Sequence, residues 1–227
     1  MSVESITNLW RNTQKIKDYG KIGTFRHKIS IIFINLKDFK NHLIILGILN
    51  LCHFQPRLSP LCIDNCREMV DQVMAVHRTS QHLHIGCDEV FSLGECQECR
   101  ALGLSNTRIF IEHVKFVAEY VRSTYNVTPI MWDDMLRQLY YHDLKPLGSL
   151  VQPMVWSYAE QVEQYISDLT WHRYATVFQS PIWAASAFKG ASGETALVPE
   201  IGRHINNNLG EPDKVSQKGL QGNFHKY

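Results

Sequence analysis

The sequence predicts an α/β fold assembled from parallel βαβ units. From about residue 59 onward, short apolar segments alternate with segments of helical periodicity, and several of the apolar segments end in polar or aromatic residues. At 227 residues with 44% hydrophobic content, the chain is long enough to bury a sizeable core. Both a (β/α)8 barrel and an open doubly wound sheet fit this alternation, but the nucleotide-binding patterns GxGxxG and GxxxxGKS/T do not occur.

The first part of the chain differs in composition from the rest. Over residues 1–55, Lys and Arg are frequent and acidic residues are few. Residues 29–34 predict a buried strand, and residues 43–49 form a second apolar run without a clear period. We therefore expect a divergent N-terminal segment at 1–55, a main domain at 56–210 and a tail at 211–227.

Helix and strand signals become regular from Ser59. Ser59 followed by Pro60 predicts a helix start, and the apolar face of that helix consists of Cys66, Val70, Val73, Met74 and His77. A longer helix begins at Ser105 or Asn106, with an apolar stripe made of Phe110, Val114, Val117 and Val121. The other predicted elements are strands at 82–86, 128–132, 151–156 and 181–188, a loop at 94–103, and helices at 162–178 and 197–209.

The charge balance excludes two classes of partner. The chain has 23 Lys and Arg against 22 Asp and Glu, so it lacks the basic excess that nucleic acid or an anionic membrane surface requires. The first 25 residues lack the apolar core of a secretory signal, and the most apolar stretch, 43–52, is about half the ~20 residues that span a bilayer. We therefore expect a soluble protein of the cytoplasm, without a cofactor and with an undetermined oligomeric state.

The six cysteines are too few for a disulfide scaffold in a chain of this length. The pairs Cys62/Cys66 and Cys96/Cys99 have spacings that could begin a zinc site, but neither has a second pair at a finger-like distance. Free structural thiols are the favoured interpretation, and we expect no bound metal.

The strongest local signal is His84-Ile85-Gly86-Cys87-Asp88-Glu89. Two adjacent carboxylates at the mouth of a buried strand repel each other, and this repulsion raises at least one pKa, as a general acid at neutral pH requires. An arbitrary Asp–Glu pair more often caps a helix or pairs with arginine. Here the preceding strand, Gly86 and the polar ends of the neighbouring strands favour catalysis, since the C-terminal strand ends carry the chemistry of barrel enzymes.

The sequence resembles the family 20 glycoside hydrolases, the β-N-acetylhexosaminidases, whose signature is His-x-Gly-x-Asp-Glu after a strand. Four segments carry the resemblance in order, and they look like the hexosaminidase D branch, although Cys87 stands where many members have glycine. The segments are LHIGCDEVFSLGE (83–95), PIMWDDMLR (129–137), PMVWSY (153–158) and IWAASAFKGA (182–191). The resemblance covers about residues 56–210 and extends the expected location to the nucleus.

The resemblance implies a (β/α)8 TIM-type barrel and retaining, substrate-assisted hydrolysis of terminal β-linked N-acetylhexosamine. The 2-acetamido oxygen of the substrate attacks the anomeric carbon, so no enzyme group is the nucleophile. By position, Glu89 is the general acid and then the base, and Asp88 orients the acetamido group and stabilises positive charge. Trp132 and Trp156 match tryptophans that wall the acetamido pocket.

Other residues have several candidate roles. Asp133 and Asp134 have open alternatives: they bind sugar hydroxyls, they bind groups behind the site, or they cap the following helix. The sequence does not favour one alternative over the others. Tyr158 is a candidate for a contact with a sugar hydroxyl. His84 is expected to be a bonded structural histidine that faces the barrel interior. Residues 24–27 are similar to a Thr-Phe-Gly-His motif on the family's third strand, so that His27 matches an active-site histidine.

The chain departs from the family pattern at both ends. A complete barrel takes about 250 residues, and only strands four to seven are clear; strands one, two and eight have no visible counterpart. The chain therefore looks truncated at both ends, and an incomplete barrel is expected. The alternatives are an inactive fragment, a non-catalytic carbohydrate-binding or scaffold protein, and a metal-dependent hydrolase that uses Asp88, Glu89, Asp133 and Asp134. The sequence leaves open the preference between N-acetylglucosamine and N-acetylgalactosamine.

Overall fold

A computed structural model describes residues 32–34, 43–45, 60–91, 93–185, 187, 198 and 200–207. The motif at 24–27 with His27, most of the predicted N-terminal segment and the predicted tail lie outside these residues.

The described strands form one sheet in the order in which they occur along the chain. They are β1 (Ile32–Ile34), β2 (Leu43–Ile45), β3 (His82–His84), β4 (Thr128–Trp132), β5 (Gln152–Trp156) and β6 (Trp183–Ala185). From β2 to β6 all neighbours are parallel, which confirms the prediction of a parallel α/β sheet. β1 pairs antiparallel with β2 and so departs from the all-parallel wall that a barrel predicts.

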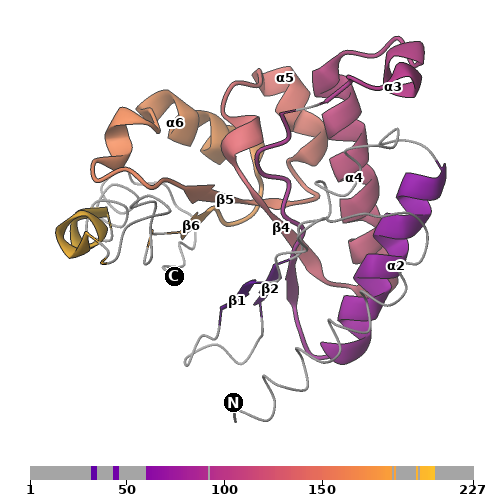
Figure 1. Cartoon of the computed structure of the whole chain (residues 1–227), viewed down its shortest axis with the longest axis horizontal. Coiled ribbons are helices and arrows are strands. Elements are labelled where there is room, and N and C mark those ends of the chain that lie inside the picture. The colour runs from indigo at the N-terminus through magenta and orange to yellow at the C-terminus, as the bar shows by residue number, and fades with distance from the viewer. Residues whose placement is uncertain are drawn as a thin grey trace.

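The sequential strand order distinguishes the described part of the sheet from a doubly wound sheet. In a doubly wound sheet the order reverses at a switch point, and the helices then cover both faces. Here each parallel strand pairs with the strand that precedes it in the chain, always on the same side. Right-handed crossovers then place the connecting helices on one face of the sheet. Figure 1 shows this arrangement, with α2, α4, α5 and α6 along one side of the strands. The described part of the sheet is therefore singly wound.

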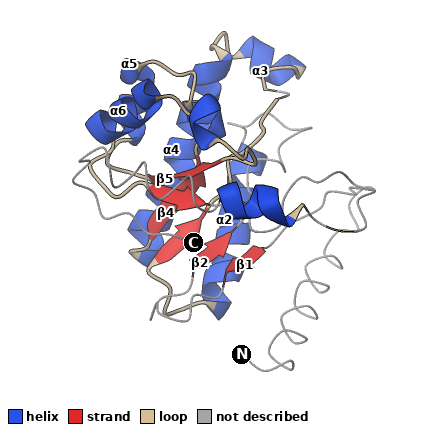
Figure 2. Ribbon diagram, turned by 90° about the vertical axis from the view of Figure 1, so that its left-hand side faces the viewer, coloured by secondary structure: helices blue, strands red, loops and turns tan. Residues whose placement is uncertain are grey.

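The helices are α2 (Pro60–Val76), α3 (Gln97–Ala101), α4 (Asn106–Tyr125), α5 (Tyr141–Leu144) and α6 (Asp168–Val177), with 3-10 turns η2 (Asp134–Leu136), η3 (Lys145–Leu147) and η4 (Val162–Gln164). Residues 201–207 are also helical. Figure 2 separates these elements from the strands by colour. Among the helices that the structure describes, none combines the length and apolarity needed to cross a bilayer.

Helix α4 confirms the predicted helix in both its start and its buried face. The hydroxyl of Ser105 accepts a hydrogen bond from the Arg108 N–H at 3.2 Å, which satisfies one of the free donors of the first turn. The predicted stripe of Phe110, Val114, Val117 and Val121 is buried. The helix ends at Asn126, whose φ of 53° is the left-handed conformation that commonly closes helices.

Two other predicted segments differ from the structure. The predicted loop at 94–103 contains α3, because the Cys96 thiol caps it by accepting a hydrogen bond from the Cys99 N–H at 3.2 Å. The predicted helix at 162–178 is divided into η4 and α6. Ser167 causes this division, since its hydroxyl caps a new helix start through the Thr170 N–H.

Side chains alternate between the two faces of the sheet. Met131 and Val155 point into the large core between the strands and the helices. The opposite face carries a smaller apolar cluster formed by Ile130, Met154 and Trp183, against which Trp132 packs. Both faces are therefore apolar, and the polar residues of the candidate site lie at the ends of the strands.

Candidate active site

The predicted site residues that the structure describes lie at the C-terminal ends of three neighbouring parallel strands, and His27 lies outside the described residues. The segment 86–91 follows β3, Asp133 and Asp134 follow β4, and Ser157 and Tyr158 follow β5. Parallel pairing brings these ends to one edge, as the sequence predicted.

The acid pair lies on a loop with an unusual backbone. Gly86, Cys87 and Glu89 have φ values of 77°, 76° and 50°, which side-chain-bearing residues rarely adopt. The left-handed conformation costs about 1–2 kcal/mol for a non-glycine residue. Such strain persists only where surrounding contacts hold the backbone, and it concentrates at functional sites.

Asp88 has a raised pKa. Burial raises its pKa, and the negative charges of Asp134 and Glu89 raise it further, while a backbone hydrogen bond opposes the rise. The Asp88 side chain is half-buried and Glu89 is exposed. The raised pKa therefore belongs to the residue for which the family resemblance implies a charged role.

A row of aromatic rings borders the acid pair. The Trp132 and Trp156 rings lie 6.3 Å apart, centroid to centroid, in an edge-to-face arrangement, and Tyr158 lies 5.1 Å from Trp156. At the other end of the row, the His84 ring is 4.4 Å from Trp132. Both tryptophans are half-buried. The row offers apolar ring faces of the kind that pack against a sugar or an acetyl methyl group.

The His84 side chain is completely buried beneath this row. Its Nδ1 accepts a hydrogen bond from the Gly86 N–H at 3.1 Å, so the proton of the neutral ring is on Nε2. Nε2 has no hydrogen-bond partner among the described residues. Burial lowers the pKa of His84 to about 3, which keeps the ring neutral. The expected bonded histidine is thus bonded through one nitrogen.

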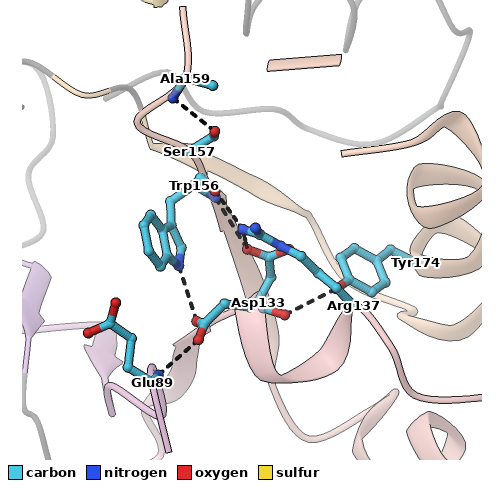
Figure 3. A network of polar contacts seen from close by, with 8 residues as sticks. Glu89, Asp133, Arg137, Trp156, Ser157, Ala159 and Tyr174 are labelled. Carbon is cyan, nitrogen blue, oxygen red and sulfur yellow. Dashed lines mark hydrogen bonds and ion pairs between the residues drawn. The ribbon is translucent and has the colours of Figure 1, made fainter. Parts of the chain in front are cut away.

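Asp133 is fully buried in a network that joins β4, β5 and α6 (Figure 3). Arg137 donates to both of its carboxylate oxygens, at 2.8 and 2.6 Å, and also to the carbonyl oxygen of Trp156 at 2.5 Å. The hydroxyl of Tyr174 approaches the same carboxylate at 3.3 Å. Burial raises the pKa of Asp133, and the contact with Arg137 opposes that rise. Of the alternatives for Asp133, this geometry favours contacts behind the site over a sugar hydroxyl.

Asp134 links the loop that carries the acid pair (the acid loop, residues 86–91) to the aromatic row of Trp132, Trp156 and Tyr158. Its Oδ2 accepts a hydrogen bond from the Glu89 N–H at 2.8 Å, and its Oδ1 accepts one from the indole N–H of Trp156 at 3.1 Å. Figure 3 shows the Glu89 carboxylate projecting away from these bonds, while the Trp156 indole nitrogen faces them. One carboxylate therefore contacts groups from two other strand ends.

The loop that carries Tyr158 is held by the helix at 201–207. The buried Asn207 amide donates to the carbonyl oxygens of Ser157 and Ala159, at 2.9 and 2.6 Å, and Arg203 donates to the Tyr158 carbonyl at 3.3 Å. Sequence reasoning missed Asn207, because no local pattern marks it. It also missed Arg137, although the spacing of four from Asp133 signals a side-chain pair.

The structure bears on two further predictions, the metal-dependent alternative and the expectation that the cysteines are free thiols. The described residues contain no group of three or more His, Cys, Asp or Glu suited to hold a metal ion. Asp133, one proposed ligand of the metal-dependent alternative, is already engaged by Arg137. Cys66, Cys87, Cys96 and Cys99 are thiols outside any disulfide, as expected, but Cys62 is disulfide-bonded, which corrects the expectation for that residue.

Comparison with known proteins supports the resemblance drawn from the motifs. No family model matches the chain. Hexosaminidase D of Homo sapiens is 38% identical over 148 residues, which is 62% of this chain and 30% of that protein. Hexosaminidase D of Bos taurus is 36% identical over 148 residues, which is 62% of this chain and 43% of that protein. The chain thus spans less than half the length of these two relatives. Over the matched part of its length, it is a relative of hexosaminidase D.

Proposed function

We propose that this chain carries the catalytic carboxylates and one wall of the acetamido pocket of a β-N-acetylhexosaminidase. The relatives named hexosaminidase suggest glycoside hydrolase activity. The observation that carries the finer proposal is that the Asp88–Glu89 pair and the rings of Trp132 and Trp156 share one edge of the sheet, where Asp134 connects them.

In this proposal Glu89 protonates the leaving oxygen and later activates water. Its exposed side chain is consistent with access to a substrate. Asp88 accepts a hydrogen bond from the acetamido N–H and stabilises the charge of the oxazolinium. An N–H donated to a desolvated carboxylate favours its charged form. Substrate binding would therefore reverse the raised pKa of Asp88 at the moment when its charge is needed.

The fold within this proposal is the wall of a (β/α)8 barrel formed by the main domain at 56–210. The sequential parallel order from β2 to β6, with helices on one face, supports it. Trp132, Trp156 and Tyr158 then face the sugar, and Asp133 holds the pocket from behind. The proposed partner is a glycoside with a terminal N-acetylhexosamine, and the proposed location remains the cytoplasm or nucleus.

Glu89→Gln tests the acid role. Turnover of N-acetylhexosaminides with poor leaving groups should fall by roughly 10²–10⁴-fold, because general-acid assistance is lost. Substrates with an acidic phenol leaving group need less protonation and should lose less in the glycosylation step. Exposed Glu119 lies on α4, so Glu119→Gln is the matched control. Equal losses on both substrate types, with glycosylation rate-limiting, would contradict the assignment.

Substrate choice tests the substrate-assisted mechanism separately. Because the acetamido oxygen is the nucleophile, β-glucosides with a plain 2-hydroxyl should be almost inert beside the 2-acetamido sugars. Kinetic measurement on matched aryl glycosides of the two types decides this. Comparable hydrolysis of both would remove the oxazolinium from the proposal.

A further inference from the structure

Asp134 connects two parts of the site whose relative position matters for the proposed reaction. One is the backbone of Glu89, whose N–H donates to Oδ2, and the other is the indole of Trp156, whose N–H donates to Oδ1. Glu89 lies 45 positions before Asp134, and Trp156 lies 22 positions after it. Glu89 follows β3, Asp134 follows β4, and Trp156 is the last residue of β5, the next strand of the sheet.

We infer that Asp134 is a positioning residue that fixes the general acid loop against the aromatic wall of the sugar pocket. This inference rests on the proposed function. Asp134 acts through Glu89 and Trp156, and the bond to the Glu89 backbone leaves the Glu89 carboxylate directed away from it (Figure 3).

The two contacts require a carboxylate. Both partners are donors, and a carboxylate has two acceptor oxygens, whereas an amide has one acceptor and one donor group. Asparagine at position 134 would therefore place its NH2 against either the Glu89 N–H or the Trp156 indole N–H. Hydrogen bonds to an ionised acceptor are also shorter and stronger than neutral ones, so the native arrangement is well suited to hold a strained segment.

The acid loop is such a segment. Glu89 has φ of 50° and Cys87 has φ of 76°, conformations that cost free energy unless neighbouring groups stabilise them. The bond from the Glu89 N–H to Asp134 acts at one of these positions. Loss of the bond would free the loop to relax, and a displacement of about 1 Å at a catalytic group can lower the rate by ~10²-fold.

The first test uses the full chain and is independent of turnover. In a 1H–15N spectrum, Trp156→Phe identifies the indole resonance of Trp156. Asp134→Asn should move that resonance or the backbone amide resonance of Glu89, since the amide serves one donor and not both. The indole of Trp183, which donates to Gln152 at 2.6 Å, should stay in place and report an intact fold. Unchanged Trp156 and Glu89 resonances would overturn the inference.

The second test is a double-mutant cycle on kcat/KM. Asp134→Asn alone should lower kcat/KM by roughly 10–100-fold. In the Trp156→Phe background the indole donor is gone, so the carbonyl oxygen of the asparagine can serve the Glu89 N–H. The effect of Asp134→Asn should then shrink to roughly a few-fold, because contacting residues are energetically coupled. Asp64→Asn, which changes an exposed aspartate on α2, is the matched control.

The outcomes separate the inference from the proposed function. An equal loss from Asp134→Asn in both backgrounds would overturn the positioning role while leaving the hexosaminidase proposal in place. If the unaltered chain has no turnover, the proposed function fails, and the resonances alone then decide whether Asp134 joins the two elements.

Discussion

At the scale of single residues, Asp88 stands in an environment that opposes its negative charge. Burial and two neighbouring carboxylates raise the pKa of Asp88, and the backbone on either side of it is left-handed at Cys87 and Glu89. The left-handed backbone and the raised pKa both cost free energy in this loop. A substrate N–H that donates a hydrogen bond to Asp88 would recover part of this free energy, and the recovered part would favour substrate binding.

Asp88→Asn should therefore stabilise the chain while it lowers activity. The raised pKa means that the folded state favours the neutral carboxyl, and asparagine is neutral at every pH. At pH 7 the variant should have a higher free energy of unfolding, and the gain should shrink as the pH falls toward 3.8, the ordinary value for aspartate. Turnover should drop by roughly 10²–10³-fold. Urea unfolding at several pH values measures the first effect; lower stability at pH 7 would contradict the argument.

At the scale of elements, capping and a buried ion pair support the edge that carries the site. Helix α4 packs behind β4 and starts at a serine cap. The Asp133–Arg137 pair joins the end of β4 to the carbonyl of Trp156 at the end of β5. Among the described residues, neither the cap nor the ion pair contacts the acid pair. Their loss is therefore expected to lower the free energy of unfolding and to shift the ends of β4 and β5.

Ser105→Ala should lower the free energy of unfolding by about 1 kcal/mol, because an N–H in the first turn of α4 loses its acceptor. Ser123→Ala in the last turn of the same helix is the control, since the Ser123 hydroxyl is exposed and donates only to the Tyr120 carbonyl among the contacts described. Denaturant titration compares the two. Equal effects would show that the cap is not the cause.

Arg137→Met should cost far more than Arg108→Met. Removal of Arg137 leaves the fully buried Asp133 carboxylate without its cation, and breaking such a pair typically costs about 3–5 kcal/mol. Arg108 pairs with Glu112 on the surface of α4, where an ion pair contributes about 0–1 kcal/mol. Thermal or urea unfolding of both variants checks this, and similar losses would argue against a charged Asp133.

At the scale of the whole molecule, the described sheet carries helices on one face and Trp132, Trp183 and His84 on the other. His84 lies there, neutral and fully buried, with Trp132 against it. Protonation of this ring would place a charge in an apolar interior without a described partner for Nε2. The stability of the fold is thereby linked to pH.

The free energy of unfolding should fall as the pH drops below about 6.5. The unfolded chain binds a proton at His84 near its ordinary pKa of 6.5, whereas the folded chain binds it only near 3, so acid favours unfolding between these values. The loss from this one group approaches ~1.4 kcal/mol per pH unit. Urea unfolding at pH 7 and pH 5 measures it. His84→Gln should flatten the dependence, while exposed His172→Gln should not; an unchanged slope in His84→Gln would refute the linkage.

Local sequence determined the alternation of strands and helices, the start and buried stripe of α4 and the limits of β4, because these depend on periodicity and capping within a few residues. It also predicted that the acid pair and both tryptophans share an edge, since parallel strands end on the same side. Tertiary structure alone decided the antiparallel β1, the burial of Asp133 and the bridge made by Asp134. These features depend on contacts between backbone and side-chain groups that are far apart in the sequence. The spacing of residues along the chain does not predict such contacts.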